Sequence, residues 1–509
     1  MEKELSRRDF IKASVATAAS AAVLSAVNNI MPTAQAEAEP QPQFEGRRKF
    51  AGVHNVRNIT DDLVYLGASD RRLALFENVY PIPRGVSYNA YLLLDEQTVL
   101  FDTVDRSVSG QFFENLEYAL NGRKLDYFVI NHMEPDHCSA MTEVIARYPD
   151  VKLLYSKAAE KMITQFFGFN PAKYGWGVDE GMELVTGRHK LVFLMAPMVH
   201  WPEVMMTYDA TDKVLFSADA FGTFGSLDGN LFADEVNFAE EWLPDARRYY
   251  TNIVGKYGPQ VQNVLKKAST VDIQTICPLH GPVWRENLGW IIEKYDLWSR
   301  YEPENKDGVM VVYGSIYGGT ESAANVLASR LSHNGVQNVK VYDVSKTHVS
   351  ELIAEAFRVS TIVFASITYN NDLFTPMKNF MNDLLAHNLQ NRDYALIENG
   401  TWSPVAAGKM KEIIGGMADM RPVGSTVTLL STTTEQNFLD LQALGDELTG
   451  VLTGTVVIPV AESAAAAPAA APAEKWLCTV CGYVHEGEMT PDFKCPLCGV
   501  GPDRFEKRS

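Results

Sequence analysis

Short apolar runs that end in polar residues dominate the first half of the chain. Runs at 91–94 and 98–101 flank Asp95-Glu96-Gln97 and predict a β-hairpin. Further apolar runs then lead, one after another, into a histidine or an aspartate; they lie at 128–130, 191–195, 214–216 and 273–276. Because α/β enzymes assemble their sites where strand ends and loops converge, this pattern predicts an α/β domain at 48–300 with a site at one edge.

A different pattern follows at 306–460, where buried strands alternate with helical stretches. The predicted strands are Val309–Tyr313, Val339–Val341, Thr361–Ala365, Tyr394–Ile397 and Thr426–Leu430. Alternation of this kind is typical of a doubly wound parallel sheet. Residues 461–474 are rich in alanine and proline and predict a linker, after which 475–509 form a small cysteine-containing domain.

The N-terminal residues have the features of an export signal. Ser6-Arg7-Arg8-Asp9-Phe10 is a twin-arginine pattern, an alanine-rich run follows, and Ala34-Gln35-Ala36 resembles a cleavage site. We therefore expect 1–36 to direct export by the twin-arginine route. No later segment has the roughly 20 apolar residues of a membrane span, so we expect a periplasmic or extracytoplasmic protein, tethered only if the signal stays uncleaved.

The overall charge narrows the choice of partner. The 509 residues carry a formal net charge of -18, and no basic face stands out. Binding to nucleic acid requires lysine and arginine to replace the counterions of the phosphates. We therefore expect small molecules and proteins as partners, and no nucleic acid.

The stretch NHMEPDHC at 131–138 concentrates metal-binding side chains in one turn. Four candidate ligands lie in this turn, and one more follows each of three later predicted strands. The full set is His132, Glu134, Asp136, His137, His200, Asp219 and His280. A turn with so many donors could serve two adjacent metal positions. Carboxylates among the ligands favour a harder ion such as iron over zinc.

This constellation resembles the metallo-β-lactamase superfamily, which implies an αββα sandwich. In its hydrolases, histidine usually occupies the position of Glu134 and the metal is zinc. With glutamate there, and with the segments APMVHWP, LFSADAFG and CPLHGP, the chain resembles the flavodiiron proteins. The resemblance implies one iron at His132, Glu134, His200 and Asp219, and a second at Asp136, His137, Asp219 and His280. Asp219 would bridge the two irons.

The loop Ser315-Ile316-Tyr317-Gly318-Gly319-Thr320-Glu321 lies between a predicted strand and a helix that we expect to begin near Glu321. Hydroxyls and backbone amides at such a position bind phosphate. The loop resembles the phosphate loop of flavodoxins and so implies FMN. Two later loops would flank the flavin ring, and their candidate residues are Ser366, Ile367, Thr368, Tyr369 and Asn370, then Asn399, Gly400, Thr401 and Trp402.

The C-terminal cysteines form two C-x-x-C knuckles, and they are Cys478, Cys481, Cys495 and Cys498. Four thiolates suit a tetrahedral site for iron or zinc. Cys-Gly-Tyr followed by Cys-Pro-x-Cys-Gly resembles rubredoxin, which implies one iron that cycles by one electron. A structural zinc ribbon is the alternative.

Together these resemblances imply a flavodiiron protein with a fused rubredoxin domain. Electrons would pass from an unidentified donor to the rubredoxin iron, then to FMN, and then to a diiron site that reduces O₂ to water or NO to N₂O. Both gases stay open, because members that prefer either one share the ligands. The family also implies a head-to-tail homodimer or homotetramer. Two other classes remain: a zinc hydrolase that keeps the flavodoxin as a scaffold, and a redox sensor or electron relay without turnover.

Overall fold

The computed structural model describes residues 50, 54–455, 474–496 and 498–508. The predicted export signal at 1–36 lies outside these residues, as does the predicted linker at 461–474 except for its last residue. Within the described ranges, no helix is both long enough and apolar enough to cross a membrane.

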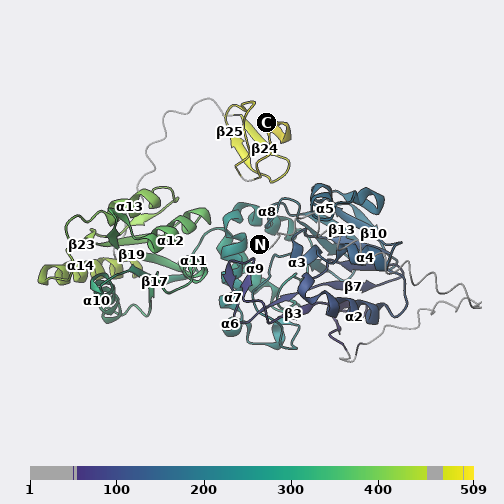
Figure 1. Ribbon diagram of the computed structural model, residues 1–509, viewed down its shortest axis with the longest axis horizontal. Coiled ribbons are helices and arrows are strands. Elements are labelled where there is room, and N and C mark those ends of the chain that lie inside the picture. Colours follow the sequence, from purple (N-terminus) through teal and green to yellow (C-terminus); the bar gives the residue numbers. More distant parts are fainter. Residues whose placement is uncertain (1–49, 51–53, 456–473, 497, 509) are drawn as a thin grey trace, which may run out of the picture. The chain divides into compact units, whose positions relative to one another are not determined.

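Two sheets form the centre of the first domain (Figure 1). The seven-stranded sheet has the order β1-β2-β7-β8-β9-β10-β11, with bounds Arg57–Asn58, Leu63–Tyr65, Tyr91–Leu94, Thr98–Phe101, Tyr127–Ile130, Lys152–Ser156 and Gly175–Val178. The five-stranded sheet has the order β12-β13-β14-β15-β16, with bounds Glu183–Val185, Lys190–Met195, Met205–Asp209, Val214–Phe216 and Thr275–Cys277. Two small hairpin sheets pair β3 (Ala68–Asp70) with β6 (Val86–Tyr88) and β4 (Leu75–Phe76) with β5 (Tyr80–Pro81).

The inner faces of the two large sheets share one core. Phe101 of β8 and Phe216 of β15 stack with their ring centroids 3.7 Å apart, and both side chains are buried. The outer faces are covered by helices, whose bounds are α2 Ser109–Leu120, α3 Pro135–Cys138, α4 Met141–Arg147, α5 Ala159–Phe167, α6 Phe238–Glu241, α7 Leu243–Tyr249, α8 Gly258–Ala268 and α9 Leu288–Ser299. The predicted αββα sandwich is confirmed.

Local sequence explains these elements well. Helix α2 buries Phe112, Phe113 and Leu116 on one stripe and ends at Asn121, which adopts a left-handed conformation. The predicted hairpin matches β7 and β8. The run at 273–276 is shifted, because the strand it predicts begins only at Thr275.

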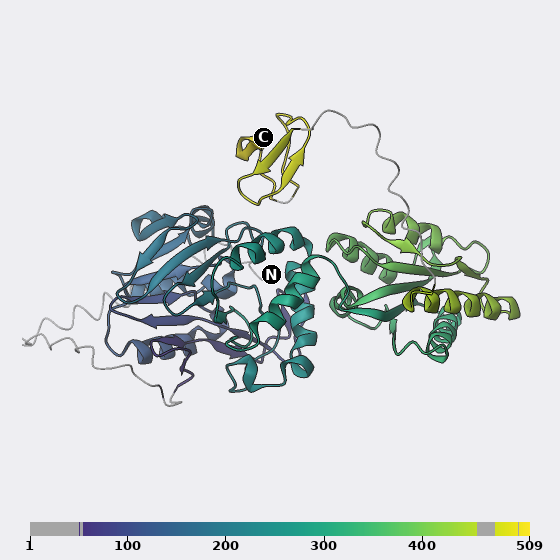
Figure 2. The same cartoon turned by 180° about the vertical axis from the view of Figure 1, so that it is seen from behind.

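The second domain is a parallel sheet with helices on both faces, seen from the opposite side in Figure 2. Its main strands have the order β18-β17-β19-β21-β22, with β23 also paired to β21, and their bounds are β17 Asn305–Gly314, β18 Asn338–Asp343, β19 Val359–Tyr369, β21 Asp393–Asn399, β22 Arg421–Pro422 and β23 Val427–Leu429. A short strand, β20 (Asp372–Leu373), pairs antiparallel with β19. This order is the flavodoxin-like one, with a topological switch point between β17 and β19.

Two apolar clusters cover the two faces of this sheet. One cluster contains α10 (Gly319–His333) and α14 (Glu435–Leu452), and the other contains α11 (Val349–Arg358), α12 (Thr375–Ala386) and α13 (Ala406–Ile414). Helix α10 begins at Gly319, two residues before the predicted start. Both glycines of the loop therefore lie at its N-terminus.

The C-terminal domain is a three-stranded antiparallel sheet of order β25-β24-β26. Its strands are β24 Lys475–Cys478, β25 Val484–Glu486 and β26 Phe505–Arg508. Phe505 is buried beside Phe493, with the ring centroids 5.4 Å apart. So small a domain has little apolar core, which leaves the four cysteines to hold its loops together.

Candidate metal centres and cofactor pocket

The seven predicted metal-binding residues of the first domain come together at one edge of the sandwich. They lie in loops after β9, β13, β15 and β16 and in the short helix α3. Strands β13 and β15 both run antiparallel to β14, and β15 is parallel to β16, so these three strands end at the same edge. All seven side chains are buried.

The first group contains His132, Glu134, His200 and Asp219. Glu134 Oε2 lies 3.2 Å from His132 Nε2 and 3.0 Å from His200 Nε2. Asp219 Oδ2 lies 3.3 Å and 3.0 Å from the same two nitrogens. The two carboxylates and two imidazoles thus direct their donor atoms at a common point.

The second group contains Asp136, His137 and His280, and it shares Asp219 with the first. His137 Nε2 lies 3.1 Å from His280 Nε2, and both lie 3.3 Å from Asp136 Oδ2. Asp219 Oδ1 is 3.0 Å from His137 Nε2. Since Oδ2 of Asp219 faces the first group and Oδ1 the second, its carboxylate has the geometry of a bridge between two ions.

The chemistry of these donors fits metal ions. Among the described residues, both oxygens of Asp136 and Oδ1 of Asp219 are buried without a hydrogen-bond partner. Buried carboxylates without donors need a cation or pay a large desolvation energy. The donor set of histidine nitrogens and carboxylate oxygens suits iron, so the residues present fit the expected diiron group.

Electrostatics support the same conclusion. Burial disfavours a charge on His132, yet Asp219 and the neighbouring carboxylates raise the pKa of His132 well above its ordinary value. Burial likewise opposes a charge on Asp219, but His137 and His132 hold the pKa of that carboxyl well below its ordinary value. Metal ions must therefore displace protons from these imidazoles, which makes metal affinity dependent on pH.

Two residues that hold the metal-binding turn in place were missed from the sequence. Asp102, directly after β8, accepts hydrogen bonds from the backbone N–H groups of Asn131 (2.8 Å) and His132 (3.2 Å) and from the Asn131 side chain (2.7 Å). Glu203 lies against the imidazole of His132. Asp102 directly follows a predicted strand, as the ligands do, and that position was the available signal, whereas Glu203 lies eight positions after the predicted run 191–195 and had no such signal.

The isolated cysteines and the remaining buried histidine lie outside these groups. Cys138 is a buried free thiol whose Sγ lies 3.2 Å from the carbonyl oxygen of Met133, and burial raises the pKa of Cys138. Cys277 is also free and buried. His189 is buried between Asp62 and Asp209, with nitrogen–oxygen distances of 3.0 Å and 2.6 Å. Since Arg188 Nη2 lies 2.9 Å from Asp62 and 2.8 Å from His189 Nε2, a guanidinium already supplies the cation of that cluster.

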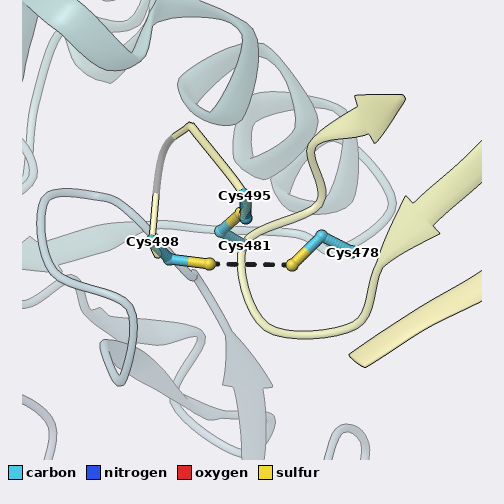
Figure 3. Close-up of side chains that lie close together, drawn as sticks. All are labelled: Cys478, Cys481, Cys495 and Cys498. Carbon is cyan, nitrogen blue, oxygen red and sulfur yellow. Dashed lines mark hydrogen bonds between the residues drawn. The ribbon is translucent and has the colours of Figure 1, made fainter. Parts of the chain in front are cut away.

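The four C-terminal cysteines converge on a second kind of site (Figure 3). The sulfur atoms of Cys478 and Cys498 are 3.6 Å apart, and those of Cys481 and Cys495 are 3.4 Å apart. Tetrahedral coordination with metal–sulfur bonds of ~2.3 Å places sulfur atoms ~3.8 Å apart. The cysteines therefore fit one tetrahedral ion.

A cavity of about 430 Å³ lies at the switch point of the parallel sheet. Its walls come mainly from the three predicted loops, with one residue from the loop after β23. The lining residues are Ser315, Ile316, Tyr317, Gly319, Thr320, Ile367, Thr368, Tyr369, Asn370, Asn371, Asn399, Gly400, Thr401, Trp402, Ser403 and Ser431. Its volume is within the range of cofactor pockets, and the N-terminus of α10 supplies amide groups for a phosphate. The cavity thus fits FMN.

Most predicted flavin contacts line this cavity, with some differences. Gly318, Glu321 and Ser366 do not line it, because Ser366 is buried within β19 and Glu321 lies in the first turn of α10. Ile316, Asn371 and Ser403 also line it from the three predicted loops, although they were not among the predicted contact residues, and Ser431 lines it from outside those loops. Ser431 comes from the loop after β23, which no motif marked. Asn399 fixes that loop by accepting the N–H of Ser431 at 2.9 Å and donating to its carbonyl oxygen at 3.0 Å.

Four family models match the chain in the same order as these parts. They are a twin-arginine translocation pathway signal at 4–23, an ODP family beta lactamase at 86–281, a flavodoxin at 311–417, and the rubredoxin-like domain of rubrerythrin at 476–506. The predicted flavodoxin-like and rubredoxin-like domains are thereby confirmed.

Curated relatives and solved structures extend these matches. The anaerobic nitric oxide reductase flavorubredoxin of Aeromonas hydrophila is 31% identical over 88% of this chain and 98% of its own length, and that of Vibrio vulnificus is 30% identical over the same shares. The rubredoxin oxygen:oxidoreductase of Desulfovibrio gigas is 27% identical, with a TM-score of 0.73 over 78% of this chain and 99% of that one. The flavodiiron protein of Giardia intestinalis shares the fold, with a TM-score of 0.71. The chain belongs to the flavorubredoxin family of flavodiiron proteins.

Proposed function

We propose that this protein reduces NO to N₂O, or O₂ to water, at a diiron site that receives electrons through FMN and a rubredoxin-type iron. The observation that carries this proposal is the geometry of Asp219, whose two carboxylate oxygens face two separate groups of metal-binding side chains. A two-metal site in one chain with a flavin pocket and a four-cysteine site suits a reaction that takes up several electrons.

The residues of the site have distinct tasks in this scheme. His132, Glu134 and His200 would hold one iron, Asp136, His137 and His280 the other, and Asp219 both. The irons supply a place where a small gas binds and receives electrons. Around them, the rings of Phe76, Tyr88 and Tyr249 lie 5.4 to 5.7 Å from the ring of His280 and pack against this side of the site.

Glu134 favours iron redox chemistry over zinc hydrolysis. A histidine at this position would leave the first group with fewer anionic donors, which suits zinc. The carboxylate of Glu134 instead adds a negative charge next to Asp219, and this stabilises the more highly charged states of iron. Two zinc ions per chain without flavin absorbance in the purified protein would refute the reductase assignment.

Electron entry follows from the four-cysteine site. We assign Cys478, Cys481, Cys495 and Cys498 to one iron, which would supply one-electron chemistry beside an FMN that can store two electrons. The twin-arginine signal supports export, and we place the mature protein on the extracytoplasmic side with its unidentified donor. Fractionation of cells that produce the tagged full-length chain tests this placement, and a cytoplasmic mature protein would contradict it.

Anaerobic turnover of the pre-reduced protein with NO and with O₂, measured side by side, tests the reaction. Asp219→Ala removes a donor from both metal positions while leaving the flavin domain untouched. Loss of a residue that only hydrogen-bonds to a metal ligand lowers activity by roughly 10- to 100-fold. We expect Asp219→Ala, which removes a ligand itself, to lower gas consumption by more than that and to keep FMN. Asp150→Ala, which changes an exposed aspartate of the same domain, is the control and keeps full activity. Iron content and gas consumption at the wild-type level in Asp219→Ala would contradict the bridge.

We further propose a head-to-tail homodimer in which the flavin of one subunit serves the irons of its partner. Tyr317 and Trp402, on the flavin cavity, are 98% and 90% exposed in the single chain. Such exposed aromatic side chains around a redox cofactor suit coverage by a second subunit.

Co-expression of a variant impaired in FMN binding and a variant impaired in iron binding tests this arrangement. One subunit carries Gly319→Ala in the flavin loop and the other carries Asp219→Ala. In a head-to-tail heterodimer, the intact flavin of the second subunit faces the intact irons of the first, so activity returns. If the flavin serves the irons of its own chain, no subunit has both cofactors and the heterodimer stays inactive.

A further inference from the structure

Glu203 is a buried carboxylate next to the metal-binding turn for which the proposed reaction has given no role. It lies between β13 and β14, three residues after His200, and only 2% of its surface is exposed. Its side chain points to His132, which comes from the other sheet of the sandwich.

The hydrogen bonds of Glu203 define the protonation of His132. Glu203 Oε1 lies 2.8 Å from His132 Nδ1 and accepts the backbone N–H of Met133 at 2.9 Å. Oε1 is thus an acceptor that holds a hydrogen on Nδ1, which leaves Nε2 as the nitrogen that would bind a metal after giving up its proton. That Nε2 lies 3.2 Å from Glu134 Oε2 and 3.3 Å from Asp219 Oδ2, in the first metal group.

The charge of Glu203 has no other partner. Within the described ranges, no lysine or arginine forms an ion pair with it, and its Oε2 is buried without a hydrogen-bond partner. A buried carboxylate needs compensation by an opposite charge. The imidazole of His132 can supply this compensation, because a cation bound at Nε2 would polarise the ring and place positive charge next to Glu203.

The second metal group lacks an equivalent of Glu203. Its His280 directs Nδ1 to the carbonyl oxygen of Ser87 at 2.8 Å, which is a neutral acceptor. Its His137 has an Nδ1 that is buried without a hydrogen-bond partner among the described residues. An anionic partner makes an imidazole a stronger donor than a neutral one does, so the outer environment distinguishes the two positions.

We propose that Glu203 is a positioning residue that fixes His132 as an Nε2 ligand and makes the metal position of His132, Glu134 and His200 the tighter of the two. This inference rests on the proposed diiron site. It predicts stepwise loading, in which the first iron to enter occupies that position and the position of Asp136, His137 and His280 fills second.

Metal loading of the full-length protein tests this order. The diiron site is emptied with a chelator and titrated anaerobically with ⁵⁷Fe(II), while Mössbauer spectra separate iron bound by nitrogen and oxygen from iron bound by four sulfurs. In the wild type we expect the first equivalent to give one nitrogen/oxygen signal and the second equivalent to add another. In Glu203→Gln, which removes the charge at constant size, we expect the first step to weaken by about 10- to 100-fold and the first equivalent to divide between two signals.

Thr207→Val is the matched control. Thr207 is buried and donates to Asn131 Oδ1 at 2.8 Å, so this variant removes a hydrogen bond from the same turn without touching an imidazole. Ordered loading should survive in it. If Glu203→Gln does not fold, as judged by circular dichroism and thermal unfolding, Glu203→Asp replaces it, because the shorter side chain withdraws the carboxylate from Nδ1.

The outcomes separate this inference from the proposed function. Two unchanged binding steps in Glu203→Gln, or an equal weakening of both steps, would overturn the role of Glu203. Failure of the wild type to bind iron at the nitrogen/oxygen sites would refute the diiron assignment itself. Gas consumption is not needed for either decision.

Discussion

Substitution of Gly319 by alanine tests the flavin cavity, because the added methyl group would clash with one identified backbone atom. It is the first residue of α10, where the loop after β17 meets the loop after β23. A Cβ atom on Gly319 would lie 2.1 Å from the carbonyl oxygen of Ser431, whereas ordinary contact begins at 3.4 Å. Gly319→Ala therefore requires one of the two backbone segments to move by roughly 1 Å or more.

The consequence can be estimated from the hydrogen bonds that hold Ser431. Asn399 makes two with its backbone, of 2.9 Å and 3.0 Å, and a shift of this size breaks both. At about 0.5–1.5 kcal/mol each, their loss removes about 1–3 kcal/mol from the organised cavity. Since 1.4 kcal/mol is a factor of ten, we expect FMN to bind roughly 10- to 100-fold more weakly.

The assay is a titration of flavin-free protein with FMN, followed by the quenching of flavin fluorescence. Metal content is measured in parallel and should not change, because the metal ligands lie in the first domain. Gly408→Ala is the matched control: Gly408 lies in α13 of the same domain, is exposed, and would place its Cβ in open space. Equal FMN affinity in Gly319→Ala and Gly408→Ala would refute the assignment of this loop to the flavin.

Two further predictions concern other parts of the chain. Burial opposes a charge on His189, but the carboxylates of Asp209 and Asp62 outweigh burial and raise the pKa of His189 to about 9. The ion pairs of protonated His189 therefore stabilise the folded protein fully below the unfolded pKa of about 6.5. This stabilisation is lost as pH rises through 9. After allowance for solvent screening, this stabilisation is worth roughly 1–2 kcal/mol. The difference in urea stability between wild type and His189→Gln should therefore shrink between pH 6.5 and pH 10. A difference that is independent of pH would contradict the ion pairs. Cys481→Ser should lose the four-sulfur iron and slow reduction by a protein donor, yet keep gas consumption with a chemical reductant that reduces the flavin directly. Loss of both activities in Cys481→Ser would show that this site does more than admit electrons.

Much of the architecture could be read from hydrophobic patterning, because strands and helices of this protein bury regular faces. The hairpin of β7 and β8 and the five predicted strands of the flavodoxin-like domain, which match β17, β18, β19, β21 and β23, are examples. The ligands could be found because each follows an apolar run, and because Glu134 and its neighbours lie in one short motif. The start of α10 was placed two residues late, since a glycine pair gives no positive helix signal.

Supporting residues were harder to find for a physical reason. Glu203 touches His132 from 71 positions away, and only the packing of the two sheets brings them together. Ser431 reaches the flavin cavity because β23 lies beside β21, a pairing that its own sequence does not announce. Contacts that depend on tertiary structure leave no local pattern, whereas ligands at strand ends do.

The spread of the metal ligands along the chain has a consequence for how the protein matures. His137 and His280 contact each other in the second metal group, although 143 positions of the sequence separate them. A partial chain that lacks the loop after β16 lacks His280, so the second metal group is complete only after the whole first domain has folded. The twin-arginine route, which we propose for this chain, carries folded proteins across the membrane, so on this proposal folding and iron uptake come before export. On the same proposal, the cytoplasm supplies the iron of a protein that acts outside it.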